Sequence, residues 1–307
     1  MAWIFVGGSQ RSGTSLLQQL LCQPPFTNPY IYECAYLSQL VSVYDGVRSS
    51  FSRNHQCYFN GEDGFRSFHA LLVRAFLEHA RQHLRADSHL VLKEPHLTCL
   101  WPSLYELVPE SVFLMIVRDP RDIVASMVTV GEKQKMLGQS YFFAERNIPV
   151  LCQHLLSFYE PALSVTDAGF RERLSIVLYE QLVSQPETTL QQISEVTGID
   201  FLSRGRHAVQ GTMNSVVDED WNRRSKLYSP WVTELSGKAV SESKVGSFRT
   251  ILTESEIQQV EEQCSAFFEW FGYERHAATT PATHAILEGP HFLHPAPVSA
   301  TQKSDAF

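Results

Sequence analysis

The sequence predicts an α/β fold of the P-loop type, in which a central parallel sheet is flanked by helices in three layers. Apolar runs of strand character span Trp3–Val6, His89–Leu92 and Val112–Val117, and a helical pattern follows each of them. A loop containing glycine joins the first strand to its helix. Strands that alternate with helices in this way pair in parallel, so their carboxyl ends are expected to meet at one edge.

The loop after the first strand reads Gly-Gly-Ser-Gln-Arg-Ser-Gly-Thr-Ser from Gly7 to Ser15 and has the features of an anion-binding site. Free backbone N–H groups and the helix dipole favour an anion at the start of a helix, and glycine allows close approach. A tight turn without a ligand is the structural alternative. The predicted anion-binding residues are Ser9, Gln10, Arg11, Ser12, Gly13, Thr14 and Ser15.

The loop departs from the standard triphosphate motif at one position. Gly8 and Gly13 have the spacing of a nucleoside triphosphate P-loop, but Thr14 stands where that motif requires lysine. The cation that the loop itself offers is Arg11. A phosphate or sulfate group therefore suits the loop better than the usual ATP chemistry.

Length and composition set the domain organisation. The chain of 307 residues, 44% of them hydrophobic, is long enough for one large α/β domain, which we assign to residues 1–276. Residues 277–307 are rich in Thr, Pro, Ala and His without periodicity and are expected to form a flexible tail. A net charge of −8 argues against nucleic acid as a partner.

Cysteine usage and hydropathy predict the compartment. The 6 cysteines are scattered without metal-ligand spacing, so we expect reduced thiols and no bound metal. No signal peptide precedes the first strand, and no apolar run reaches the roughly 18 residues of a membrane helix. The sequence therefore predicts a cytoplasmic protein that does not contact a membrane.

Charged residues follow the second and third predicted strands, at Lys93 and Arg118. Ligands of open α/β sheets bind at these carboxyl ends, so both residues are site candidates. Ser126 lies about two helical turns after Arg118, and a guanidinium with a hydroxyl suits a second phosphate group. For Lys93, the structural alternative is an ion pair with Glu94 or Glu33.

Glu33 is a candidate base because it stands among aromatic residues in the segment Tyr30–Leu37. Partial burial there would raise the pKa of its carboxyl and make it a better proton acceptor near neutral pH. A solvent-facing carboxylate at the start of a helix fits the composition equally well. The residues alone leave both interpretations open.

Together, the Gly7–Ser15 loop and the segment Phe113–Ser126 resemble the sulfotransferases that use PAPS, 3′-phosphoadenosine 5′-phosphosulfate. The likeness extends over roughly Trp3–Glu274. It implies that the loop holds the 5′-phosphosulfate of the donor and that Arg118 and Ser126 hold its 3′-phosphate. PAPS would then be a co-substrate, and no metal would be required.

Two later stretches share the resemblance. Ile176–Val183 is similar to the family's late strand, which implies that Tyr179 lies near the adenine. Residues 244–249 are similar to the family's closing phosphate loop, but they lack its full basic pattern. This departure leaves Lys244 and Arg249 as alternative contacts of the donor.

The Arg-Ser-Gly-Thr sequence places the likeness in the branch that includes tyrosylprotein and bacterial small-molecule sulfotransferases. By this resemblance, Glu33 takes the position of the general base and Lys93 that of a cation that stabilises the transition state. Arg11 supplies a second cation from the loop. His96 is a rival base because it lies close to Lys93 in the sequence.

These residues predict transfer of a sulfuryl group to a hydroxyl or amine of a small-molecule or carrier-bound acceptor. A P-loop kinase or triphosphatase is one alternative, disfavoured by Thr14 and by Arg118, which interrupts the approach to a magnesium-binding Asp119. A catalytically inactive nucleotide-binding protein is the other, and it would lack a cation or a base. A polar excursion at residues 45–64 and a basic, aromatic segment at residues 203–240 are expected to shape the acceptor site.

Overall fold

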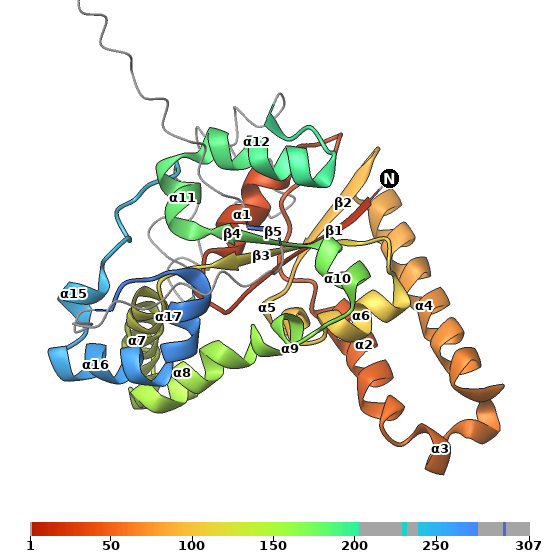
Figure 1. Cartoon of the computed structure of the whole chain (residues 1–307), viewed down its shortest axis with the longest axis horizontal. Coiled ribbons are helices and arrows are strands. Elements are labelled where there is room, and N and C mark those ends of the chain that lie inside the picture. The colour runs from red at the N-terminus through yellow and green to blue at the C-terminus, as the bar shows by residue number, and fades with distance from the viewer. Residues whose placement is uncertain (1, 203–228, 232–238, 276–290, 293–307) are drawn as a thin grey trace, which may run out of the picture.

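The computed structural model describes residues 2–202, 229–231, 239–275 and 291–292 (Figure 1). At its centre is a sheet with the strand order β2-β1-β3-β4-β5, in which every neighbouring pair is parallel. The strands are β1 (Ala2–Gly7), β2 (His89–Lys93), β3 (Val112–Val117), β4 (Leu174–Leu178) and β5 (His291–Phe292). The predicted α/β fold is confirmed. The short β5 lies within residues 277–307, where a tail was expected, and the rest of that stretch lies outside the described residues.

Helices cover both faces of the sheet because the strand side chains alternate between two buried clusters. Ile4 and Val6 belong to one cluster, and Trp3 and Phe5 belong to the other. Helices on the first face are α1 (Thr14–Leu21), α11 (Tyr179–Ser184) and α12 (Pro186–Thr197). Helices on the second face include α5 (Pro95–Thr98), α6 (Trp101–Leu107), α9 (Glu160–Leu163) and α10 (Ala168–Arg173). A sheet covered on both faces explains why its strands read as continuous apolar runs.

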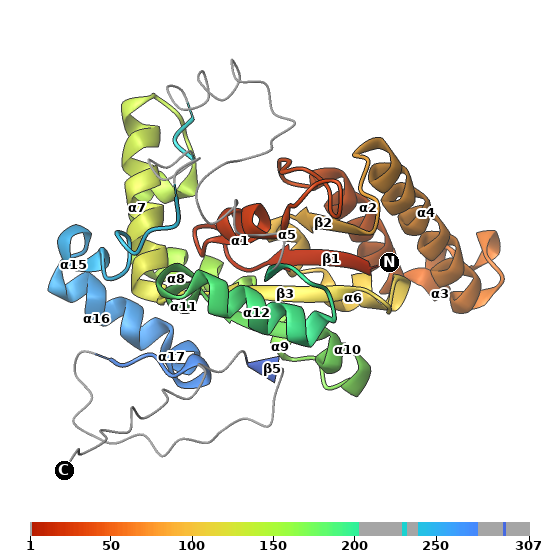
Figure 2. The same ribbon diagram turned by 90° about the horizontal axis from the view of Figure 1, so that it is seen from above.

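A helical pair projects from the sheet on the side away from α7 (Pro120–Met136) in both views (Figures 1 and 2). Its elements are α2 (Ala35–Arg48), α3 (Phe51–Asn54), η1 (Gln56–Tyr58) and α4 (Gly61–His83). The ring centroid of Phe65 lies 5.3 Å from that of Tyr44 and 5.1 Å from that of Phe51. These contacts hold residues 45–64 in the tip of the pair. The excursion at residues 45–64, which was expected to shape the acceptor site, therefore lies away from the carboxyl ends of the strands.

A second group of helices packs around α7, and α7 itself lies beyond the carboxyl ends of the strands (Figure 2). The group includes η2 (Phe142–Glu145), α8 (Ile148–Ser157), α15 (Phe248–Ile251), α16 (Glu254–Gln263) and α17 (Ser265–Phe271). Arg121 on α7 pairs with Glu261 on α16 at 2.6 Å, and both side chains are buried. This ion pair fixes α16, and with it the segment 239–275, to α7 at the edge of the sheet where the first loop lies.

The late strand is shorter than the sequence analysis predicted. β4 ends at Leu178, and Tyr179 begins α11. The buried residues of this helix are Tyr179, Leu182 and Val183, which have the i, i+3, i+4 spacing of one helical face. Apolar residues that were assigned to a strand therefore pack as a helix against the sheet.

The segment 203–240, which was expected to shape the acceptor site, is described only at residues 229–231 and 239–240. Its predicted role at the acceptor site therefore falls largely on residues outside the described ranges. Of the helices that the structure describes, none is both long and apolar enough to cross a bilayer.

Gly131 tests the packing of α7 against η2. A Cβ on this residue would overlap the backbone carbonyl of Phe143, so Gly131→Ala must push the two elements apart. We expect it to lower the free energy of unfolding by about 1–3 kcal/mol in urea denaturation. The control is Gly46→Ala in α2, where no atom lies within 4 Å of the new Cβ and where helix propensity predicts up to about 1 kcal/mol of stabilisation. Equal stabilities of the two variants would contradict this packing.

Candidate active site

Glycines and internal hydrogen bonds hold the loop between β1 and α1. Gly8 and Gly13 have φ angles of 133° and 106°, which residues with a Cβ rarely adopt. The Gly8 N–H donates to Thr98 Oγ1 at 2.9 Å, and the Ser12 hydroxyl donates to the Ser9 carbonyl at 2.7 Å. Ser9 and Ser12 are fully buried, so these two predicted anion ligands fix the loop through their side chains.

The start of α1 leaves backbone donors for an anion. Thr14 and Ser15 are the first residues of this helix, and the first N–H groups of a helix have no intrahelical acceptor. Thr14 is buried and Ser15 is exposed. The positive end of the helix dipole adds to the attraction of an anion at this point.

Arg11 crosses from the loop to α7. Its backbone is in the left-handed region with a φ of 73°. Its Nε donates to Ser126 Oγ at 3.1 Å, and its Nη1 donates to the carbonyl of Trp231 at 3.0 Å. Burial, followed by the charge of Arg118, lowers the pKa of Arg11 to about 10, so the guanidinium stays protonated at neutral pH. The structure thus brings together Arg11, Ser126 and Arg118 as predicted.

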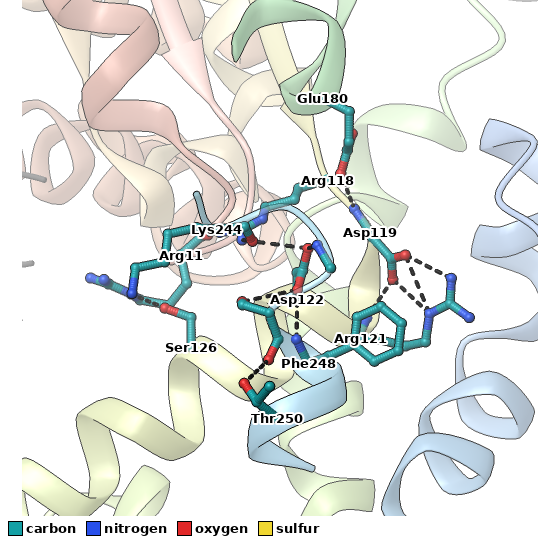
Figure 3. A network of polar contacts seen from close by, with 12 residues as sticks. Arg11, Arg118, Asp119, Arg121, Asp122, Ser126, Glu180, Lys244, Phe248 and Thr250 are labelled. Carbon is teal, nitrogen blue, oxygen red and sulfur yellow. Dashed lines mark hydrogen bonds and ion pairs between the residues drawn. The ribbon is translucent and has the colours of Figure 1, made fainter. Parts of the chain in front are cut away.

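Arg118 lies buried at the carboxyl end of β3 (Figure 3). Its Nη1 donates to the Arg11 carbonyl at 3.3 Å and its Nη2 to the Lys244 carbonyl at 2.5 Å. Its guanidinium carbon lies 4.4 Å from the ring centroid of Tyr179. Its Nε is buried and has no hydrogen-bond partner among the described residues. One donor of this guanidinium is therefore available to a ligand.

Tyr179 supports both Arg118 and the loop. A Cβ at Gly13 would lie 2.6 Å from the Tyr179 ring, so this contact requires glycine. The ring therefore separates the loop from β4 and provides the aromatic face on which Arg118 rests. Its expected position near an adenine stays a prediction.

Asp122 joins the closing segment to α7, and the sequence analysis missed it (Figure 3). Its carboxylate accepts from the Gly246 N–H at 2.8 Å, the Ser247 hydroxyl at 3.1 Å and the Phe248 N–H at 2.9 Å. It also lies 3.6 Å from Arg118 Nη2. The sequence signal for this contact is the spacing of Asp122 four positions after Arg118, which places an acid and a base about one helical turn apart.

The two alternative donor contacts occupy different places. Lys244 turns its carbonyl toward Arg118, so its backbone lies at the site. The guanidinium of Arg249 lies over the ring of Phe248, with its carbon 4.6 Å from the centroid. Among the described residues, neither side chain forms a hydrogen bond with Arg11 or Ser126, and both residues stay candidates for the donor contact.

Lys93 and Glu33 form an ion pair, with Lys93 Nζ 2.8 Å from Glu33 Oε1. The Lys93 side chain is 4% exposed, whereas that of Glu33 is 53% exposed. Of the two interpretations left open for Glu33, this exposure favours the solvent-facing carboxylate, and the ion pair considered as the structural alternative for Lys93 is present. The buried carboxyl is that of Glu94, whose pKa is raised by burial and by the charge of Glu33.

His96 lies on the exposed side of the same edge, at the start of α5. The Glu94 carboxyl accepts from its backbone N–H at 3.1 Å and caps this short helix. The His96 ring faces Gln10 of the loop, with 3.4 Å between the two Nε2 atoms. His96 therefore lies beside the loop, and Glu33, whose charge acts on Arg11, pairs with Lys93 at the same edge. Within the described part of the chain, no three His, Cys, Asp or Glu residues cluster as metal ligands.

Comparison with known proteins identifies the family. The model of the sulfotransferase family matches residues 3–203. This chain belongs to the sulfotransferase family. The protein-tyrosine sulfotransferase 2 of Gallus gallus is 27% identical over 204 residues, which make up 66% of this chain and 52% of that protein. A putative protein-tyrosine sulfotransferase of Caenorhabditis briggsae is 26% identical over 216 residues, or 66% of this chain and 68% of that protein. This chain spans about half the length of the chicken relative.

Solved structures of sulfotransferases share the fold. A sulfotransferase domain from a Synechococcus olefin synthase has a TM-score of 0.53 and 17% identity, covering 89% of this chain and 95% of its own. The sulfotransferase domain from the curacin biosynthetic pathway has a TM-score of 0.50 and 19% identity, with coverages of 86% and 97%. The P-loop-like architecture expected from the sequence is therefore the architecture of this chain as well.

Removing the charge of Asp122 should loosen the closing segment of this chain. Asp122→Asn leaves Arg118 without its carboxylate and turns an amide N–H₂ group toward at least one backbone donor. We expect a loss of about 3 kcal/mol of stability and faster hydrogen exchange at the Gly246 and Phe248 amides. Mass spectrometry of exchanged peptides measures this change.

The matched control is Asp63→Asn, which removes an ion pair with Arg66 on α4 from a side chain that is 89% exposed. Its cost should stay below about 1 kcal/mol. Unchanged exchange at residues 246–248 in Asp122→Asn would contradict the anchoring role of this carboxylate.

Proposed function

We propose that this protein transfers a sulfuryl group from PAPS to a hydroxyl or amine of an acceptor. The observation that carries the proposal is the convergence of Arg11, Arg118 and Ser126 at one edge of the sheet (Figure 3). Among the described residues, the buried Nε of Arg118 has no hydrogen-bond partner. Family membership supports the reaction class. A donor with phosphate groups at both ends of a nucleoside suits a site with two arginines, Arg11 in the loop and Arg118 after β3.

The residues present fit the two anionic ends of this co-substrate. The loop Ser9–Ser15 and the N–H groups at the start of α1 would receive the 5′-phosphosulfate. Arg118 and Ser126 would receive the 3′-phosphate, and Lys244 or Arg249 would close over it. Thr14 in place of the P-loop lysine argues against a kinase or triphosphatase.

The chemistry follows from where charge develops. In an in-line transfer, the acceptor oxygen or nitrogen bonds to sulfur as the bond from sulfur to the 5′-phosphate oxygen breaks. Negative charge then grows on the departing phosphate, and Arg11, Lys93 and the α1 amides stabilise it without moving. The proton of the acceptor passes to Glu33 or to His96.

The acceptor that we propose is an alcohol or amine, either a free small molecule or a group bound to a carrier. A net charge of −8 makes a strongly anionic glycan a poor partner. The names of the curated relatives make a peptide tyrosine the competing acceptor. The half-exposed Glu33 and the exposed His96 leave room for an acceptor at the mouth of the site.

Calorimetry with adenosine 3′,5′-bisphosphate, the desulfated product, tests the donor. We expect micromolar binding and no comparable binding of ATP. Arg118→Ala should weaken the binding of the bisphosphate by more than tenfold, which is about 1.4 kcal/mol. Because Arg118 also holds Lys244, Ser126→Ala is the second variant, and it should weaken binding without removing a buried charge.

The control for these variants is Arg74→Ala on α4, which removes an exposed ion pair with Glu110 and should leave binding unchanged. A preference for ATP would overturn the proposed donor. So would equal affinities of the wild type, Arg118→Ala and Ser126→Ala for the bisphosphate.

Two substitutions decide which residue is the base. Loss of a general base lowers the rate constant by about 10²–10⁴, so the larger loss of kcat between Glu33→Gln and His96→Gln identifies it. Turnover is measured with labelled PAPS against a panel of alcohols, amines and tyrosine peptides. If neither variant lowers kcat by as much as tenfold, neither residue is the base.

A further inference from the structure

Gln10 of the loop connects two histidines that lie on different helices. Its side-chain Nε2 lies 3.4 Å from Nε2 of His96 on α5, and its Oε1 lies 3.2 Å from Nε2 of His154 on α8. The loop, α5 and α8 therefore meet through one amide group. His154 was not among the site residues predicted from the sequence.

The two histidines have contrasting surroundings. The ring of His154 packs against Phe142, Phe143 and Phe158, with centroid separations of 4.6, 5.7 and 4.9 Å. Burial, followed by the charge of His96, lowers the pKa of His154 to about 4, so its ring is neutral at neutral pH. His96 is exposed and contacts Phe158 on one side. His96 is thus the member of the pair that can exchange protons with an acceptor.

Hydrogen-bond chemistry links the two rings. An amide side chain donates from its nitrogen and accepts at its oxygen, whereas a neutral imidazole nitrogen does one or the other. Whichever way the Gln10 amide lies, one histidine must carry a proton on Nε2 and the other must not. The neutral rings therefore hold opposite tautomers.

We propose that Gln10 is a positioning residue whose amide, shared with His154, decides whether Nδ1 of His96 offers an N–H group or a lone pair to the acceptor. This inference rests on the proposed function for its catalytic meaning. With the amide nitrogen toward His96, as the structure has it, the His96 proton lies on Nδ1 and His154 donates from Nε2. In the reversed chain, His96 Nε2–H donates to Gln10 Oε1, and Nδ1 is free to take a proton.

The proton balance selects the reversed chain during transfer. When Nδ1 of His96 accepts the proton of the acceptor, the resulting imidazolium has N–H groups on both nitrogens. Only the amide oxygen can face it, so the amide nitrogen must face His154, whose own proton then lies on Nδ1. Protonation of His96 is thereby coupled to the tautomer of a second residue that does not itself change charge.

The other titratable groups at this edge are compatible with either direction of the hydrogen-bond chain through Gln10. The Tyr141 hydroxyl also bonds to the Gln10 amide, and a hydroxyl can donate or accept. The Glu94 carboxyl interacts electrostatically with His96, with Lys93 and with Glu33, but it bonds to the backbone N–H of His96. The residue that constrains the direction of the His96–Gln10–His154 hydrogen bonds is therefore His154.

Nuclear magnetic resonance of the full-length protein with ¹⁵N-labelled histidine tests this coupling without donor, acceptor or turnover. Ring nitrogen shifts are followed between about pH 5 and 8, and His96→Gln and His154→Gln assign the signals. We expect His154 to change from the Nε2–H to the Nδ1–H tautomer with the same midpoint at which His96 gains its proton. Opposite tautomers are expected above that midpoint.

Gln10→Glu is the decisive variant because a carboxylate only accepts, so both histidines can donate to it. The His96 midpoint should rise by about one pH unit or more, and its coupling to the His154 tautomer should disappear. The control is Gln153→Glu, which adds the same charge on the exposed side of α8, one residue from His154. It should shift the midpoint much less and keep the coupling.

Two results would overturn the inference. One is a His154 tautomer that stays constant while His96 titrates in the wild type. The other is an equal shift of the His96 midpoint in Gln10→Glu and Gln153→Glu. Because bisphosphate binding is measured separately, failure of the coupling leaves the proposed donor standing, and failure of the donor leaves the histidine coupling to be judged by its own spectra.

Discussion

The buried charge of Arg118 is the constraint on which the carboxyl edge of this protein depends. A guanidinium removed from water is costly unless hydrogen bonds and opposite charge compensate it. Its partners come from four separate segments: the Arg11 carbonyl, the Asp122 carboxylate, the Tyr179 ring and the Lys244 carbonyl. One side chain at the end of β3 therefore fixes the first loop, α7, α11 and the closing segment relative to one another.

Asp122 extends this arrangement because it serves two purposes at once. It offsets part of the Arg118 charge, and it satisfies two backbone N–H groups of the closing segment, at Gly246 and Phe248. A donor phosphate that binds Arg118 must therefore join an arrangement that already contains a carboxylate. The buried Nε of Arg118 has no hydrogen-bond partner within the described ranges, so it is the donor that we propose for this phosphate.

The features that the sequence predicted correctly are those that depend on neighbouring residues in the chain. The apolar strands and the glycine loop are short-range signals, and the rule that parallel strands end at one edge then places Lys93 and Arg118 beside the loop. The exposure of Glu33 could not be predicted in this way. It depends on a hydrogen bond from the Cys34 N–H to the Lys93 carbonyl at 3.0 Å, which lays this segment along the end of β2.

The features that the sequence did not predict depend on partners far away in the chain or on a hydrophobic pattern that fits both a strand and a helix. Asp122 bonds to residues more than 120 positions away, and no pattern within α7 shows which segment will return to it. The run from Ile176 onward is apolar enough to satisfy a strand or a helix, and only its packing on the sheet ends β4 at Leu178. His154 was missed because its partner is an amide on the loop and not a charged residue.

The edge divides into two sides that place different demands on the chain. On the side of Arg11, Arg118 and Lys93, cationic groups are largely buried and held by hydrogen bonds or an ion pair to other segments. On the side of Glu33 and His96, side chains are exposed and bonded mainly through one partner each. A reaction that releases a constant phosphate leaving group needs the first kind of environment, because preorganised charge stabilises the departing anion without reorganisation. An acceptor that must enter, lose a proton and leave needs the second, so changes in acceptor preference can accumulate on that side without disturbing the Arg118 arrangement.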